Sequence, residues 1–171
     1  MKMSTKFLVS AVAAVALFFS TNVNAQESRK LGIGVNVGVP TTDGYNFAIG
    51  ADARLQFDVS KQISVPVTVG YTHFVGEEIT NNLKVSDFGF IPVKAGLKVF
   101  FDESGSGLYG LGEIGAAFGV TNNSGTSFLY SPALGYSWSN GLDLGVKYEG
   151  LTKGGGNIGQ VALRIAYGFK L

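Results

Sequence analysis

The chain has 171 residues, and only 15% of them are charged, whereas ordinary soluble domains carry about 25% charged residues. Glycine occurs 25 times, which is about twice its usual share of ~7%. A formal net charge of +1 gives no indication of a nucleic-acid partner, and the absence of cysteine excludes both disulfides and a lipid-modified N-terminal cysteine.

The first 25 residues have the pattern of a secretory signal peptide. Lys2 and Lys6 form a short basic start, residues 7–20 are an apolar run, and Val23, Asn24 and Ala25 place small residues at a cleavage position. The run is shorter than the roughly 20 apolar residues that a membrane-spanning helix needs. The sequence therefore predicts a signal peptide over residues 1–25 and one domain over residues 26–171.

Eight runs of alternating apolar and polar or small residues follow, and this period of two predicts β-strands with two unlike faces. They cover residues 31–39, 46–57, 63–74, 88–101, 108–120, 127–138, 142–151 and 158–171. Segments rich in Gly, Asn, Asp and Ser join them, and the longest connection is a predicted loop over residues 75–86. Short connections predict an antiparallel meander. Phe88 and Phe90 fall on the polar face of their run, which predicts a bulge or a shifted boundary there.

The polar faces of these strands indicate what kind of sheet they form. They consist mostly of Gly, Ala, Ser and Asn with few charges, which suits the narrow interior of an eight-stranded barrel better than a surface in water. We therefore expect an all-β, eight-stranded antiparallel up-and-down transmembrane β-barrel with its apolar face in lipid, where closure pairs every backbone group. A soluble sandwich or ligand-binding barrel is the alternative, but its exterior would lack charge.

Aromatic residues lie near both ends of the predicted strands, as in the two girdles of outer-membrane barrels. With both chain ends on the periplasmic side, the outer girdle comprises Phe47, Tyr71, Phe118, Phe128, Tyr130 and Tyr148, and the inner girdle comprises Phe57, Phe101, Tyr136, Trp138, Tyr167 and Phe169.

Two stretches resemble a known family. Residues 91–119, IPVKAGLKVFFDESGSGLYGLGEIGAAFG, and residues 162–171, ALRIAYGFKL, are similar to strands of the small outer-membrane β-barrel proteins of Bacteroidota and of the OmpA transmembrane barrel. The resemblance implies location in the cell outer membrane. It also implies that the barrel-assembly machinery reads the last strand through Tyr167, Phe169 and Leu171, although the terminal Leu171 departs from the commoner aromatic.

Nine charged residues on the predicted lumen face form the main candidate site. The acids and bases nearly balance, so they predict a paired network that plugs the lumen, whereas a selective pore would show one sign of charge. In particular, Glu113 is expected to form a salt bridge with Arg164 or Arg54. The set is Asp52, Arg54, Lys94, Lys98, Glu113, Asp143, Lys147, Glu149 and Arg164.

Three further patterns give weaker indications. Gly110, Gly112 and Gly115 spell GxGxxG, but a dinucleotide site needs this motif between a strand and a helix, so we expect these glycines to make room inside the barrel. His73 is the only histidine and is predicted at the lipid interface. Acidic residues of the long connection, which are Glu77, Glu78 and Asp87, could bind calcium or bridge to lipopolysaccharide, but a solvated loop fits their spacing better.

These observations predict no catalytic, cofactor-binding or metal-binding residues. We expect a non-enzymatic monomer in contact with outer-membrane lipid and lipopolysaccharide, with a role in envelope integrity or in surface interaction through the loop over residues 75–86. Alternatives are a narrow or gated channel for small solutes or apolar molecules, a subunit of a secretion assembly, and a lipid-modifying enzyme, which the lack of a His–Ser pair disfavours.

Overall fold

The computed structural model describes residues 29–80, 83–121, 125–153 and 155–171. The predicted signal peptide lies outside these residues. In the described part of the chain, no helix is long and apolar enough to cross a membrane.

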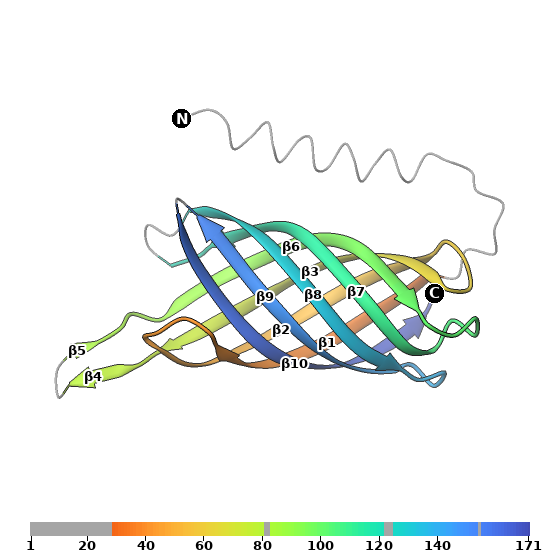
Figure 1. Cartoon of the computed structure of the whole chain (residues 1–171), viewed down its shortest axis with the longest axis horizontal. Helices are drawn as coiled ribbons and strands as arrows, with labels where there is room; N and C mark the ends of the chain where they lie inside the picture. Colours follow the sequence, from red (N-terminus) through yellow and green to blue (C-terminus); the bar gives the residue numbers. More distant parts are fainter. Residues whose placement is uncertain (1–28, 81–82, 122–124, 154) are drawn as a thin grey trace, which may run out of the picture.

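The strands form a closed antiparallel barrel in the order β1-β10-β9-β8-β7-β6-β3-β2, as Figure 1 shows. The predicted eight-stranded barrel is thus confirmed. The barrel strands have 12 to 15 residues, which at about 3.3 Å per residue and a usual tilt suffices to cross a bilayer. They are β1 (Arg29–Pro40), β2 (Tyr45–Asp58), β3 (Ile63–Gly76), β6 (Phe88–Phe100), β7 (Gly107–Gly119), β8 (Thr126–Ser137), β9 (Leu142–Lys153) and β10 (Gly156–Lys170).

The two ends of the barrel differ. At the terminal end, β1 begins beside the end of β10, and Lys30 pairs in register with Lys170. At the opposite end, here called the hairpin end, strands β4 (Glu78–Thr80) and β5 (Leu83–Lys84) pair with each other and project beyond the barrel (Figure 1). The expectation of a plain loop over residues 75–86 was therefore wrong. Paired β-formers on either side of Asn81-Asn82 are the signal that identifies a hairpin.

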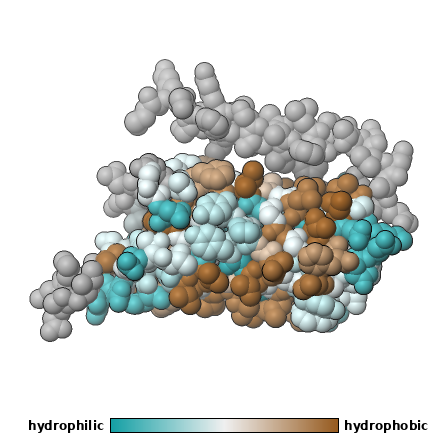
Figure 2. All heavy atoms as spheres, in the orientation of Figure 1, coloured by the Kyte–Doolittle hydropathy of each residue, from teal (hydrophilic) through white to brown (hydrophobic). Residues whose placement is uncertain are grey.

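Apolar side chains cover the outside of the barrel wall. Along β1, Val35 and Val37 are 55% and 57% exposed, whereas Asn36 between them is 4% exposed. Figure 2 shows hydrophobic residues along the wall and hydrophilic residues toward the ends. A surface of this kind is suited to lipid rather than to water.

Two details of the strands differ from the prediction. The β3–β6 and β6–β7 pairings keep one register past Phe90, so no bulge lies there; Phe90 simply faces the lumen. The register shift lies instead at the start of β2, between Tyr45 and Phe47.

The GxGxxG glycines do not all face inward. Gly110 and Gly112 share the outward face of β7 with Ile114, and only Gly115 lies on the lumen side. Strand side chains alternate between faces, so glycines two apart share one face and the third lies on the other. A Cβ on Gly115 would lie 2.6 Å from the Cα of Lys94, so this glycine permits close approach of β6 and β7.

Candidate functional site in the barrel lumen

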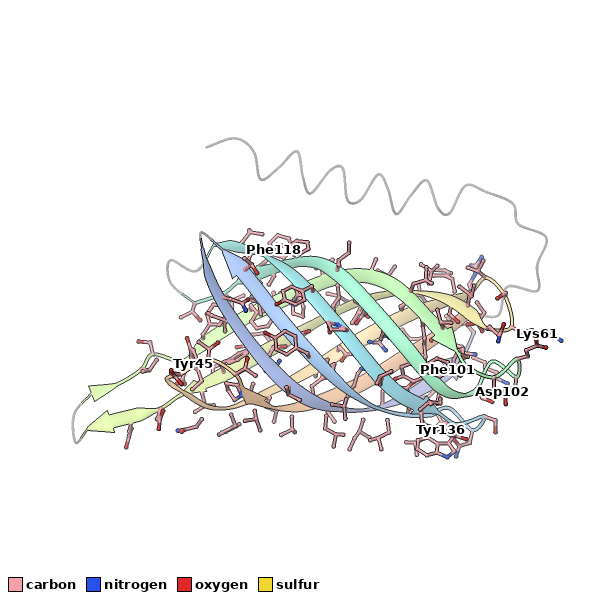
Figure 3. All side chains as sticks on the ribbon, viewed as in Figure 1. Tyr45, Lys61, Phe101, Asp102, Phe118 and Tyr136 are labelled. Atoms are coloured by element: carbon pink, nitrogen blue, oxygen red, sulfur yellow. The ribbon has the colours of Figure 1, made fainter. Side chains whose placement is uncertain are left out.

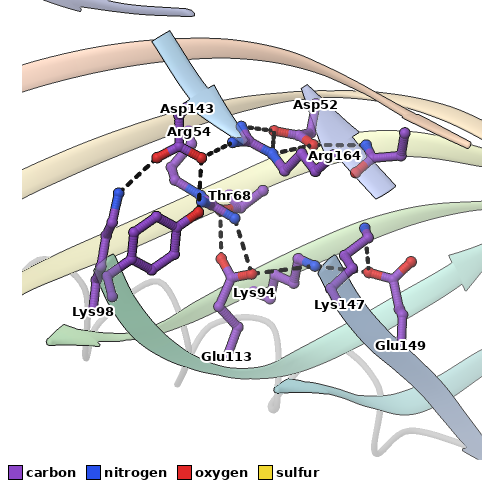
Figure 4. A network of polar contacts seen from close by, with 12 residues as sticks. Asp52, Arg54, Thr68, Lys94, Lys98, Glu113, Asp143, Lys147, Glu149 and Arg164 are labelled. Carbon is purple, nitrogen blue, oxygen red and sulfur yellow. Dashed lines mark hydrogen bonds and ion pairs between the residues drawn. The ribbon is translucent and has the colours of Figure 1, made fainter. Parts of the chain in front are cut away.

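The structure places all nine predicted lumen residues inside the barrel. Their exposed fractions range from 0% for Glu149 to 9% for Asp52. They come from β2, β6, β7, β9 and β10, and each lies at one of the alternating positions whose side chains face the lumen. They form two groups, which we call the Asp52 cluster and the Glu113 cluster (Figure 4).

The Asp52 cluster comprises Asp52, Asp143, Lys98 and Arg164, and each of its two carboxylates accepts several hydrogen bonds. Asp52 accepts from Arg164 Nε at 3.0 Å and from Asn36 Nδ2 at 2.8 Å. Asp143 accepts from Lys98 Nζ at 2.8 Å and from the Tyr109 hydroxyl at 2.7 Å. The Nη1 atom of Arg164, 3.5 Å from Asp143, joins the two carboxylates. Two cations and two carboxylates therefore balance in this cluster.

The Glu113 cluster has an excess of positive charge. Glu113 lies 3.2 Å from Arg54 Nη2 and 3.3 Å from Lys94 Nζ, and it accepts a hydrogen bond of 2.6 Å from Thr68. Lys94 also donates to Glu149 at 2.7 Å, and Lys147 donates to the same Glu149 oxygen at 3.1 Å. The cluster comprises three cations, Arg54, Lys94 and Lys147, and two carboxylates, Glu113 and Glu149.

Of the two partners expected for Glu113, the structure brings Arg54 to it and directs Arg164 to Asp52. Arg54 is further fixed by a hydrogen bond from its Nε to Thr68 at 3.0 Å. Since buried charges need partners on most of their donors and acceptors, this arrangement holds charged side chains of opposite sign together inside the barrel.

Apolar side chains inside the hairpin end were missed by the sequence reasoning. Phe74 and Phe90 are fully buried there, with ring centroids 6.1 Å apart, and Tyr45 and Phe88 pack against them. We call this group the aromatic cap. The sequence did carry a signal for this group. Phe74, Phe88 and Phe90 all occupy lumen-facing positions in the alternation of their strands, near the same end of the barrel.

A second apolar group lies nearer the terminal end, where Phe100, Tyr109 and Leu111 pack together. Lys98 Nζ sits 3.8 Å from the Tyr109 ring centroid, within the range of a cation–π interaction. The Tyr109 ring lies over Gly135 of the neighbouring strand β8, where a Cβ would lie only 2.5 Å from the ring.

The aromatic residues named as girdles lie on the outside of the barrel near its two ends. Figure 3 labels Phe118 toward the hairpin end and Phe101 and Tyr136 toward the terminal end. Neighbouring rings pack in pairs, with centroids 4.6 Å apart for Tyr136 and Trp138 and 5.0 Å apart for Tyr167 and Phe169.

His73 and the acidic residues of the long connection show no site for a metal. His73 Nε2 lies 3.4 Å from Asp87, and its Nδ1 lies 3.1 Å from the Tyr71 hydroxyl. Asp87 also accepts from the Gly76 amide at 3.0 Å, so it fastens the base of the β4–β5 hairpin. Among the described residues, no group of three or more His, Cys, Asp or Glu side chains could hold a metal ion.

Comparisons with known proteins agree with this architecture. No protein-family model and no curated protein sequence matches the chain. Among solved structures, it is similar to two crystal structures of Ail, the attachment invasion locus protein of Yersinia pestis, one of them in complex with the heparin analogue sucrose octasulfate. Both have a TM-score of 0.60, at 19% and 20% identity, and cover 85% of this chain and 100% of that chain.

A de novo designed transmembrane β-barrel is also similar, with a TM-score of 0.52 and 20% identity over 82% of this chain and 95% of the design. At this level of identity the likeness establishes the fold. The chain is an eight-stranded antiparallel β-barrel of the outer-membrane type, with transmembrane strands.

Proposed function

We propose that the chain is a monomeric, non-enzymatic outer-membrane barrel with a plugged lumen, which serves envelope integrity or surface interaction through its β4–β5 hairpin. The observation that supports this proposal is the network of buried ion pairs inside the barrel. The Asp52 and Glu113 clusters join residues of five strands across the interior, and the aromatic cap adds a second, apolar layer at the hairpin end.

The orientation and biogenesis follow from the same architecture. An even number of strands places both ends of the barrel domain on one side, and export by the predicted signal peptide makes that the periplasmic side. The hairpin end then faces the cell surface. We further propose that the barrel-assembly machinery reads β10 and the residue after it, as the resemblance to small Bacteroidota barrels implies. Phe169 in β10 and Leu171 directly after it are 47% and 72% exposed.

The charge at the hairpin end argues against carrying over a ligand from Ail. Ail is seen with a sulfated sugar analogue, and binding such a polyanion needs basic residues. Here the connections between the barrel strands at this end contain four acids and one lysine in the sequence, namely Asp43, Glu77, Glu78, Asp87 and Lys84. A surface of this charge favours a neutral or cationic partner.

Single-channel conductance in a planar bilayer tests the plugged lumen. We expect the folded chain to show no steady openings, whereas Glu113→Ala combined with Phe90→Ala, which removes one group from each layer, is expected to conduct. Steady openings of the unsubstituted chain would instead support the narrow-channel alternative.

A second experiment tests the surface role. A strain that lacks the chain is complemented either with the full chain or with a variant in which a two-residue turn replaces residues 78–84. If the hairpin carries the function, the shortened barrel should assemble in the outer membrane but fail to restore detergent resistance or surface binding. Full restoration by the shortened barrel would contradict a role for the hairpin.

A further inference from the structure

The terminal end of the barrel contains a cavity of about 470 Å³. Its walls come from the β6–β7 turn, the β8–β9 turn and the last residues of β10, and Arg54, Lys98 and Arg164 of the lumen also line it. Lys98, Asp143 and Arg164 of the Asp52 cluster form the floor of the cavity, and the aromatic cap lies at the opposite, hairpin end. The cavity is therefore a cup that opens at the terminal end, and its volume falls within the usual range for small-molecule sites, roughly 300–1,000 Å³.

Positive charge dominates the lining. Five cationic side chains line the cup against a single carboxylate, and they are Lys30, Arg54, Lys98, Arg164 and Lys170, with Asp143 as the acid. Arg54, Lys98 and Arg164 are at most 5% exposed. Four of the five are ion-paired, Arg54 with Glu113, Lys98 with Asp143, Arg164 with Asp52 and Lys30 with Asp58. Of these partners only Asp143 lines the cup. The cup is therefore lined by more cations than carboxylates, and its low-dielectric walls strengthen their field, which favours an anion.

Two of the buried cations have donors to spare. Arg164 uses Nε and Nη2 on Asp52, while Nη1 makes only the 3.5 Å contact with Asp143 among the described residues. Lys98 has three N–H donors and gives one to Asp143. An incoming oxyanion could therefore accept hydrogen bonds from both without breaking the Asp52 cluster.

The two turns add neutral donors at the mouth. Ser104 and Ser106 from the β6–β7 turn and Ser139 and Asn140 from the β8–β9 turn line the cup. Hydroxyl and amide donors around a cationic floor are the groups that bind phosphate oxygens. Together, the side chains of the floor and of the two turns offer more hydrogen-bond donors than the two oxygens of one carboxylate can accept. They therefore favour a ligand with several anionic oxygen atoms, such as a phosphate.

We infer that this cup binds a small phosphate-bearing anion at the periplasmic mouth of the barrel. Lys98 and Arg164 hold the oxyanion at the floor, and Lys170 adds positive charge at the rim together with Lys30, which is also paired with Asp58 at 3.0 Å. The phosphate comes either from a soluble compound or from the headgroup of an anionic phospholipid. The inference requires the barrel fold but not the plugged lumen, so conductance and anion binding are independent tests.

Trp138 provides a reporter, since it follows β8 at the wall of the cup, with its ring packed on Tyr136, and is the only tryptophan of the chain. The folded chain in zwitterionic detergent micelles is titrated with inorganic pyrophosphate, and tryptophan fluorescence is followed at ionic strength held constant with sodium chloride. We expect a saturable change. Lys30→Gln combined with Lys170→Gln should weaken binding about tenfold, as expected for two partly exposed charges.

Lys61→Gln is the matched control, because Lys61 is exposed at the same end (Figure 3) but does not line the cup. Its midpoint should stay within about twofold of the parent, as surface charges outside the contact contribute little. Lys170→Gln alone provides a milder test if the double variant folds poorly. A linear response, or equal midpoints in parent and variants, would overturn the inference.

A parallel titration in micelles that contain phosphatidylglycerol identifies the source of the phosphate. If the cup takes a lipid headgroup, phosphatidylglycerol should raise the pyrophosphate midpoint of the parent but not that of the double variant. An unchanged parent midpoint would assign the cup to a soluble phosphate compound.

Discussion

Replacing Glu113 by alanine is the sharpest test of the ionic lumen. Glu113 is 2% exposed, accepts hydrogen bonds from Arg54 and Thr68, and is ion-paired with Lys94. Without it, Arg54 keeps its hydrogen bond to Thr68 but has no carboxylate partner among the described residues, and the cluster retains three cations for one carboxylate, Glu149. Removing one partner of a buried ion pair typically costs about 3–5 kcal/mol, because the remaining charge is left buried and uncompensated.

The free energy of unfolding is measured by urea titration of the barrel in micelles, followed by Trp138 fluorescence. At a slope of about 2 kcal/mol per M urea, a loss of 3 kcal/mol lowers the midpoint by roughly 1.5 M. Glu103→Gln, an exposed carboxylate in the β6–β7 turn, should leave the midpoint nearly unchanged. A Glu113→Ala midpoint equal to the parent's would show that the lumen is hydrated well enough to solvate Arg54 and Lys94, and the reasoning would fail.

Three further substitutions probe other layers of the molecule. Val35→Lys places a charge on the lipid-facing wall, where Val35 is 55% exposed, and should cost about 2–4 kcal/mol in bilayers; a neutral effect there would argue for a water-facing wall. Phe90→Ala removes a fully buried ring of the aromatic cap and should lower the unfolding free energy by about 3–5 kcal/mol, measured by the same titration; a change below 1 kcal/mol would mean that the cap packs loosely. Tyr109→Phe deletes the 2.7 Å hydrogen bond to Asp143 and should cost about 1–3 kcal/mol, whereas an unchanged midpoint would indicate that water replaces the hydroxyl.

The aromatic cap shows where pattern reasoning reached its limit. The alternation correctly places Phe88 and Phe90 on the polar, inward face of their strand, but it predicts a bulge or a shifted boundary there instead of a buried aromatic group. The large aromatic side chains fit inside the barrel because they pack against small residues of other strands, such as Ala48 and Ala117 of the same cluster. Which residues stand opposite one another across a lumen depends on how the barrel closes, which alternation along one strand does not reveal.

The sequence by itself determined the number of barrel strands and the face on which the alternating apolar and charged side chains lie. Strand geometry repeats every two residues, so the alternation of Val35, Asn36 and Val37 is enough to send the valines to the wall and the asparagine to the lumen. It also identified the nine charged residues that share the interior.

Only the tertiary structure decided which of these charges pair. Arg164 and Asp52 are 112 residues apart, and Arg54 and Glu113 are 59 residues apart. Their meeting depends on the stagger that β1 and β10 adopt when they close the barrel, because stagger sets the depth of every inward side chain. The same closure brings Lys30 and Lys170 side by side and so creates the cationic cup at the terminal end.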